Sequence, residues 1–238
     1  MRILAAAVAL PLFALLAACA SIRAAEPRFT VVTVDPAREH LQLFLNDEHG
    51  RPYKRLENVA AALGRHGKRL TFAMNAGMYH ADYSPVGLFM ANGVELSPLN
   101  LASGKGNFFM RPNGVFLVTE AGALVVESSA FPGLAGKARI ATQSGPMLLS
   151  HGLINPAFDP NSRSVHIRNG VCTQDGKATF VISEERINFY DFARYMRDTL
   201  NCRDALYLDG SVSSLYSPAL GRNDHRADLG PMIGVVAD

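Results

Sequence analysis

The feature of the sequence that most constrains the fold is a succession of short apolar segments separated by turn residues. These segments are rich in β-branched and aromatic residues and too short for typical helices: FTVVTV, LQLFL, LTFAM, GVFLV, ALVVE, ATFVIS and ALYLD. Such runs are typical of β-strands. Residues that tolerate positive φ lie between several of them, at Asn92-Gly93, Glu120 to Gly122 and Asp175-Gly176, so hairpins should join these strands.

Helical periodicity stands out in two segments. In the first, Gly64 or Gly67 can end an i, i+3, i+4, i+7 stripe formed by Leu56, Val59, Ala60 and Leu63. In the second, Asn188 can cap the N-terminus and Asp191 lies in the first turn of a stripe formed by Phe189, Phe192, Ala193, Met196 and Leu200. Because hairpin signals outnumber strand-helix alternations, the sequence predicts one α+β domain over residues 26–238, with a mixed, largely antiparallel sheet and few helices.

The N-terminus has the pattern of an export signal. Arg2 precedes the apolar run ILAAAVALPLFALLAA, and small residues follow that run, as in a signal peptide. The string LAAC also resembles a bacterial lipobox, so we expect residues 1–18 to be removed, Cys19 to be lipidated, and residues 19–25 to form a short tether. Cleavage after Ala20 is the alternative, because Ala18 and Ala20 also fit a small-residue cleavage rule. Either route predicts an exported protein of the periplasm or cell envelope.

Export to an oxidising compartment would allow the two remaining cysteines to form a disulfide. Once Cys19 is lipidated or removed, Cys172 and Cys202 form an even pair in an oxidising compartment, where a disulfide persists. Two buried free thiols are the alternative. No Cys or His lies at ligand spacing beside either cysteine, and the acidic residues are not clustered with oxygen-ligand spacing, so we predict no metal and no cofactor.

The charge balance of the chain indicates which classes of partner it can attract electrostatically. Lys and Arg total 23 against 21 acidic residues, and charged residues make up only 18% of the chain. A near-neutral chain has no basic field with which to attract nucleic acid. We therefore expect no nucleic-acid partner, and a membrane contact only through the lipid on Cys19.

Polar residues at the ends of the predicted strands are candidates for a site. They lie in three motifs: Asn75 and Gly77 in NAGMY, Asn113 and Gly114 in PNGVF, and Gln143, Ser144 and Gly145 in QSGP. Each motif taken alone is equally typical of an ordinary turn.

A fourth motif, NSRSVHIRNGV, concentrates cationic side chains. If it is a strand, His166 and Arg168 share one face, near Arg163. Such a fork of guanidinium and imidazole groups favours an anionic ligand. The alternative is a solvated edge strand whose charges prevent edge-to-edge pairing.

Together these motifs resemble the phosphodiester glycosidase family. NAGMY, PNGVF, QSGP, SRSVHIRNGV, NFYDFA and ALYLDGSVSSLY occur in the family's order and span roughly Phe29 to Val236. One departure is that Asp209 is followed by Gly210, Ser211, Val212 and Ser213, where the family often has a run of glycines.

The resemblance implies cleavage of the glycosidic bond of a sugar-1-phosphodiester. Most glycosidases need two carboxylates, one of which protonates the leaving oxygen. A phosphate ester leaves without that proton, so one carboxylate serves as base or nucleophile while an arginine binds the phosphate. The resemblance places Asp209, Arg168 and Asn75 in catalysis, and it places in substrate binding Gly77, Asn113, Gln143, Ser144, Gly145, Arg163, His166, Gly210 and Ser211.

Three alternatives stay open. Asp209 can instead cap a turn with Gly210, Arg163 can replace Arg168 as the phosphate ligand, and Glu184 or Glu185 can supply a second carboxylate. At the level of the whole protein, the same pocket can belong to a noncatalytic envelope lipoprotein that binds glycan or a phosphate polymer. A further and weaker alternative for the whole protein is hydrolysis at the phosphorus atom rather than at the glycosidic bond. The sequence identifies neither the sugar nor the aglycone, and it leaves the oligomeric state open.

Overall fold

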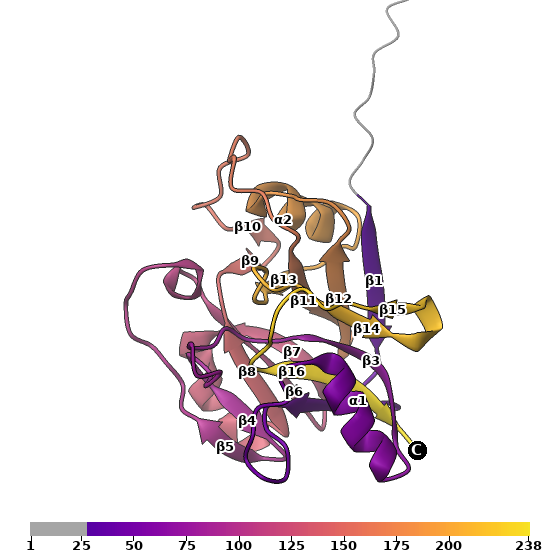
Figure 1. The fold of residues 1–238 in the computed structure, drawn as a ribbon. Coiled ribbons are helices and arrows are strands. Elements are labelled where there is room, and N and C mark those ends of the chain that lie inside the picture. Colours follow the sequence, from indigo (N-terminus) through magenta and orange to yellow (C-terminus); the bar gives the residue numbers. More distant parts are fainter. Residues whose placement is uncertain (1–27) are drawn as a thin grey trace, which may run out of the picture.

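The computed structural model describes residues 28–238 (Figure 1). The predicted signal peptide, Cys19 and the tether to residue 25 lie outside the described residues. Between residues 28 and 238, no helix is both long and apolar enough to cross a membrane.

The strands form three antiparallel sheets. Sheet 1 has the order β1-β12-β11-β13-β9-β10, with bounds Phe29–Val34, Lys177–Ser183, Asn169–Gln174, Asp204–Tyr207, Met147–Ser150 and Leu153–Ile154. Sheet 2 has the order β15-β14-β3-β16-β2, with bounds Arg222–Asn223, Leu215–Ser217, Arg69–Asn75, Met232–Ala237 and His40–Phe44. Sheet 3 has the order β5-β4-β8-β6-β7, with bounds Val94–Ser97, Phe89–Ala91, Ile140–Ser144, Gly114–Thr119 and Gly122–Glu127. The predicted α+β, largely antiparallel fold is confirmed.

The inner faces of all three sheets share one apolar core. Phe180 of sheet 1 is its centre, because its ring lies 5.1 Å from that of Phe72 in sheet 2 and 5.8 Å from that of Phe116 in sheet 3, measured between centroids. All three residues are buried. Burial of this shared core is the main force that holds the sheets together.

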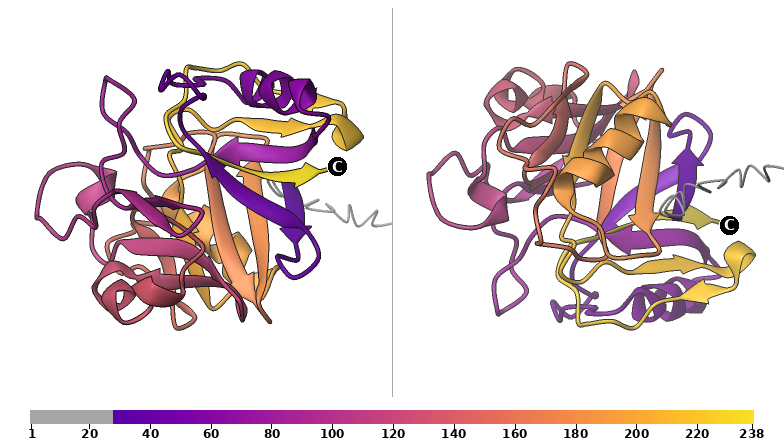
Figure 2. Two further views of the ribbon diagram at one scale, coloured as in Figure 1. Left: turned by 90° about the horizontal axis from the view of Figure 1, so that it is seen from below. Right: turned by 90° about the horizontal axis from the view of Figure 1, so that it is seen from above.

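The outer face of each sheet is covered separately. Helix α1 (Leu56–Arg65) packs on sheet 2, helix α2 (Phe189–Asp198) packs on sheet 1, and the short 3-10 helices η2 (Ser128–Gly133) and η3 (Ala135–Lys137) cover sheet 3 (Figures 1 and 2). Strands buried on both faces are apolar at successive positions rather than at alternate ones. This explains why the strand segments read as continuous apolar runs.

The local predictions are confirmed in detail. Asn188 caps α2 by accepting the backbone N–H of Asp191 at 2.8 Å. Helix α1 ends at Arg65, and Gly67 follows in the left-handed region with φ of 70°. The three predicted turns join β4 to β5, β6 to β7, and β11 to β12.

The strand considered for NSRSVHIRNGV, residues 161–171, is present only over its last three residues and is wrong for residues 161–168. Strand β11 begins only at Asn169, and the preceding segment has an isolated bridge between His166 and Ile187. The physical reason is that side chains satisfy its carbonyls: Arg168 donates to the carbonyl of Ser164, and Arg186 donates to that of Val165. These carbonyls therefore need no partner strand.

The predicted disulfide is confirmed. Cys172 of β11 is bonded to Cys202, two residues before the start of β13, and their Cα atoms lie 6.0 Å apart. Both cysteines are buried beneath α2. The bond therefore fixes β11 to the approach of β13, the strand that leads to Asp209.

Candidate functional site

Asp209 lies at the junction of sheets 1 and 2, two residues beyond the end of β13. Its backbone N–H donates to the carbonyl of Ala76 at 3.1 Å, and its carbonyl accepts the Asn75 side-chain amide at 2.7 Å. Asn75 is the last residue of β3. The ends of β13 and β3, which are distant in sequence, are therefore tied together at Asp209.

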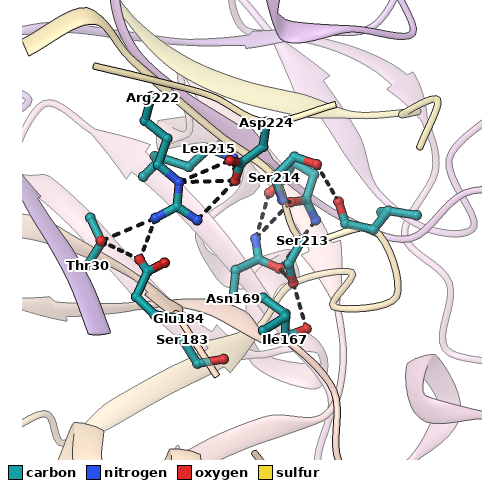
Figure 3. A network of polar contacts seen from close by, with 12 residues as sticks. Thr30, Ile167, Asn169, Ser183, Glu184, Ser213, Ser214, Leu215, Arg222 and Asp224 are labelled. Atoms are coloured by element: carbon teal, nitrogen blue, oxygen red, sulfur yellow. Dashed lines mark hydrogen bonds and ion pairs between the residues drawn. The ribbon is translucent and has the colours of Figure 1, made fainter. Parts of the chain in front are cut away.

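A neutral hydrogen-bond network supports the loop that follows Asp209. The side-chain amides of Asn75 and Asn169 pair at 3.1 Å, and the Asn75 Oδ1 also accepts the backbone N–H of Ser214 at 2.9 Å. The Ser213 hydroxyl donates to Asn169 Oδ1 at 3.0 Å (Figure 3). All four residues are buried. Asn75 thus positions the Asp209 loop and has its own polar atoms occupied.

The carboxyl group of Asp209 is half-buried and only partly bonded. Its Oδ1 accepts the backbone N–H and the hydroxyl of Ser211, at 3.3 and 3.1 Å. Its Oδ2 receives no hydrogen bond within residues 28–238. Burial raises the pKa of Asp209, against the opposing effect of the Ser211 bonds. The turn-capping contact is therefore present, but it leaves one oxygen of an acid with a raised pKa free to act.

Gly210 is required by a close approach. A Cβ atom at this position would lie 2.0 Å from the Tyr207 hydroxyl oxygen, well inside van der Waals contact. Tyr207 is 2% exposed, and its pKa is raised to about 12 by burial and by the Asp209 carboxylate, against the effect of Arg168. The Tyr207 hydroxyl therefore lies directly against the Asp209 turn.

Arg168 is buried, with 1% of its surface exposed. Its guanidinium donates to the carbonyls of Ile187 and Ser164, both at 2.8 Å, and to the Tyr207 hydroxyl at 3.2 Å. It lies 3.7 Å from the centroid of the Phe189 ring. No carboxylate pairs with Arg168 in the described part of the chain, and burial lowers its pKa. Its positive charge is therefore uncompensated.

The other two cationic candidates do not share this position. Arg163 and His166 are exposed, unlike Arg168. Burial and the charge of Arg168 lower the pKa of His166. The shared face predicted for His166 and Arg168 required a regular strand, which is absent here.

Gly77 carries the chain from sheet 2 across to sheet 3. A Cβ at Gly77 would lie 2.3 Å from the Gln143 carbonyl oxygen and 2.7 Å from Thr142 Oγ1. The Gln143 side-chain amide forms two hydrogen bonds with the backbone of Asn100. It accepts the Asn100 N–H at 2.9 Å and donates to the Asn100 carbonyl at 2.8 Å. The hydroxyls of Ser144 and Thr142 are buried without a partner in residues 28–238. The side-chain amide of Gln143 therefore has hydrogen-bond partners, whereas the Ser144 hydroxyl has none in the described residues.

Asn113 and Gly145 anchor the loop that precedes β6. Asn113 accepts from Arg111 Nη1 at 2.7 Å and donates to the Phe108 carbonyl at 3.0 Å. A Cβ at Gly145 would lie 2.8 Å from the Cβ of Asn113. Asn113 lines a cavity of about 410 Å³ whose other lining residues are Arg111, Pro112, Glu127, Ser128 and Ser129. The lining of this cavity does not include Asp209.

The two further carboxylates have other partners. Glu184 forms an ion pair with Arg222, which also pairs with Asp224 at 3.0 Å (Figure 3). Glu185 lies at the surface, 3.4 Å from Arg28. Residues 28–238 contain no group of three or more His, Cys, Asp or Glu side chains placed to hold a metal ion.

The structure thus brings together Asp209, Gly210, Ser211, Asn75 and, through Tyr207, Arg168. Sequence reasoning missed Asn169, Ser213 and Tyr207, which connect these residues. The signal for Tyr207 was its position two residues before Asp209, because alternate residues at a strand end share a face. Asn169 stands in RNGV and was indistinguishable from a turn residue.

Comparisons with known proteins give a consistent picture. A family model described as phosphodiester glycosidase matches residues 68–236. The chain is 41% identical over 218 residues to the uncharacterized protein YigE of Escherichia coli (strain K12), a match that covers 90% of this chain and 84% of that protein.

Two solved structures share the fold. One is the catalytic domain of zebrafish N-acetylglucosamine-1-phosphodiester alpha-N-acetylglucosaminidase, auto-inhibited by its pro-peptide, with a TM-score of 0.61, 13% identity, and coverage of 90% of this chain and 84% of that one. The other is a hypothetical protein from Synechocystis, with a TM-score of 0.56, 15% identity, and coverage of 91% of this chain and 61% of that one.

Proposed function

The chain belongs to the phosphodiester glycosidase family, and on that premise we propose that it hydrolyses the glycosidic bond of a sugar-1-phosphodiester. Asp209 is the base or nucleophile in this proposal. The observation that carries it is geometric: Gly210, next to Asp209, lies against the Tyr207 hydroxyl, and that hydroxyl accepts a hydrogen bond from Arg168. A half-buried carboxyl group with a raised pKa therefore lies in the same turn region as a buried cation that has no carboxylate partner in residues 28–238.

The charges suit a phosphate leaving group. Arg168 uses three of its five guanidinium N–H groups in the contacts described above. A buried positive charge without a counter-ion is costly, so an anion that reaches it is strongly favoured. As the bond between the anomeric carbon and the phosphate oxygen breaks, electrons move to that oxygen, and Arg168 offsets the growing negative charge.

Asp209 acts on the opposite side of the bond. As a base it removes a proton from the water that attacks the anomeric carbon, and as a nucleophile it attacks that carbon itself. Its free Oδ2 is the oxygen available for either role. Asn75 donates a hydrogen bond to the Asp209 backbone carbonyl. In this proposal Asn75 contributes to catalysis by positioning Asp209. Arg163, His166 and Ser211 are exposed and available to substrate, whereas Asn113, Gln143 and Gly145 shape the neighbouring loops.

Turnover of defined substrates tests the proposal. Purified protein is incubated with a panel of methyl phosphodiesters of different sugar-1-phosphates, and free reducing sugar is measured. We expect release by the wild-type protein and a loss of at least about 10³-fold in Asp209→Asn. In isotopically labelled water the label should appear on the sugar. Label on phosphate would show cleavage at phosphorus instead, and substrate binding without turnover would favour the noncatalytic lipoprotein.

We also propose that the protein is exported and anchored through Cys19. The confirmed disulfide supports this, because disulfides persist in oxidising compartments. The test is mass spectrometry of the mature N-terminus after expression in a bacterium from the full chain. A diacylglyceryl group on Cys19 is expected, and an unmodified N-terminus at Ser21 would indicate ordinary cleavage after Ala20.

A further inference from the structure

The cavity of about 410 Å³ lies at the open end of the β6-β7 hairpin, where Gly114 pairs with Glu127. Two oppositely charged side chains, Arg111 and Glu127, both line it. Neither forms an ion pair in the part of the chain that the structure describes. The lining therefore contains one charge of each sign, and the two charges do not neutralise each other by direct contact.

Arg111 is held in place by neutral acceptors. Its Nη1 donates to Asn113 Oδ1 at 2.7 Å, and its Nη2 donates to the carbonyls of Leu101 and Ala102, both at 2.8 Å. Of the five guanidinium N–H groups, one on Nε and one on Nη1 remain. These two do not share an edge of the guanidinium plane, so they cannot form the paired fork that binds carboxylate or phosphate strongly. Arg111 therefore offers the cavity two separate donors.

Glu127 offers the complementary acceptor. It is the last residue of β7 and is half-buried. Its Oε1 accepts the Ser150 hydroxyl at 3.1 Å, and its Oε2 receives no hydrogen bond from residues 28–238. A carboxylate only accepts hydrogen bonds, and its charge repels an anion that enters the same cavity. The exposed hydroxyl of Ser129 is a further lining group that can donate or accept.

An uncharged sugar fits this lining best. Each sugar hydroxyl can donate to the carboxylate and accept from the guanidinium through single hydrogen bonds. A phosphate meets the charge of Glu127, a simple cation meets the charge of Arg111, and an amino acid finds no free fork for its carboxylate. The volume of about 410 Å³ is also within the range of roughly 300–1,000 Å³ that is usual for small-molecule sites.

We propose that this cavity binds an uncharged sugar unit through Arg111 and Glu127. The lining of the cavity includes neither Asp209 nor Arg168, so it is a second site and not the place where the phosphodiester is cleaved. The inference goes beyond the proposed function and does not depend on turnover. Where both hold, the protein contacts a glycan at two places, with a phosphodiester at Asp209 and a neutral sugar in the cavity.

Binding of simple glycosides tests the inference. Methyl α-D-glucopyranoside, methyl α-D-mannopyranoside and methyl 2-acetamido-2-deoxy-α-D-glucopyranoside are titrated into purified ¹⁵N-labelled protein, and backbone amide shifts are followed by NMR. We expect at least one glycoside to shift the amides of residues 127–129 with an affinity in the millimolar range. Shifts confined to Gly210 and Ser211 would place the sugar at the Asp209 turn, and that result, or no shift with any of the three, overturns the inference.

Two variants connect the shifts to the cavity. Ser129→Phe puts a ring into the cavity at an exposed position whose side chain makes no hydrogen bond in the described residues, and Glu127→Gln removes the charge while keeping the side-chain shape. We expect each to weaken binding about tenfold or more. Ala130→Phe is the matched control, because Ala130 is the next exposed residue of η2 and does not line the cavity. Wild-type binding in Ser129→Phe or in folded Glu127→Gln contradicts the inference, and Ser129→Phe decides alone if Glu127→Gln fails to fold.

Competition tests the class of ligand. Inorganic phosphate and glycine are added in turn to the protein with bound glycoside, at constant ionic strength. Neither should displace the glycoside from residues 127–129, because the lining lacks a free fork and contains the Glu127 charge. Displacement by either one would identify a site for charged ligands and overturn the assignment. A wild-type protein without turnover would refute the proposed function, whereas these binding shifts would still decide the role of the cavity.

Discussion

Arg168 and Arg222 are both shielded from solvent, yet they have opposite electrostatic environments. Arg222 is held between Glu184 and Asp224 (Figure 3), and its bonds to these carboxylates outweigh burial and raise its pKa. Arg168 has carbonyl, phenol and aromatic neighbours, and burial lowers its pKa. A neutralised arginine braces the fold, whereas an uncompensated one retains affinity for an anion.

The two arginines also brace different parts of the same loop. Asp224 accepts the backbone N–H of Leu215 at 3.0 Å, so the Arg222 cluster holds the far end of the loop that begins at Asp209. Arg168 reaches the near end through Tyr207. We therefore propose that the charge of Arg222 serves stability and that the charge of Arg168 serves the proposed chemistry.

Among the changes that separate the two arginines, the largest expected effect is the loss of turnover in Arg168→Met. Loss of a group that stabilises developing charge typically costs about 10²- to 10³-fold in kcat, and the substituted side chain still packs against Phe189. We expect that loss in kcat/KM on a sugar-1-phosphodiester, with a melting temperature close to the wild-type value. Arg168→Lys is the control, because it keeps the charge but not the three-way hydrogen bonding. Full activity in Arg168→Met would remove the distinction between the two arginines.

Arg222→Met should show the reverse pattern. It leaves the Glu184 and Asp224 carboxylates without their partner, and these side chains are 28% and 16% exposed. We expect the free energy of unfolding to fall by about 2–3 kcal/mol, less than for a fully buried pair, as measured by urea denaturation. Turnover per folded molecule should stay within about threefold of wild type, because no atom of the Asp209 turn is lost. A larger loss in turnover with unchanged stability would reverse the assignment.

The smallest expected effect is a pH-dependent change in the melting temperature of Asp209→Asn. Because its pKa is raised in the folded state, the folded protein binds its proton more tightly than the unfolded chain, and Asp209 lowers stability as pH rises through the folded pKa. Asp209→Asn should therefore melt a few degrees above wild type at neutral pH and at the same temperature near pH 3. Melting curves across pH give the comparison. A lower melting temperature for Asp209→Asn at neutral pH would mean that the Ser211 bonds outweigh burial.

Most of the correct predictions from the sequence concerned features that depend on neighbouring residues or on the cellular compartment. The Asn188 cap, the turn at Asp175-Gly176 and the cysteine pair depend on neighbouring residues or on compartment, and all three are confirmed. The division of the strands among three sheets was not predictable, because apolar runs buried on both faces give no sign of which sheet they join.

The candidate site was predictable only in part, for a related reason. The family motifs pointed to Asp209, but the amide pair of Asn75 and Asn169 joins residues 94 positions apart. Periodicity misled over residues 161–168, because the guanidinium of Arg168 satisfies backbone carbonyls that a strand would otherwise satisfy. Long side chains that replace ladder hydrogen bonds leave no pattern in sequence spacing.

The position of β16 has a consequence for synthesis of the protein. This strand, Met232–Ala237, lies in the middle of sheet 2 between β3 and β2, and it pairs with both. Sheet 2 therefore cannot close until almost the whole chain has left the ribosome, and the junction that presents Asp209 cannot form before then. Long-range strand pairing of this kind is slow to form. Under the export proposed above, sheet 2 would close only after β16 has passed through the translocation channel.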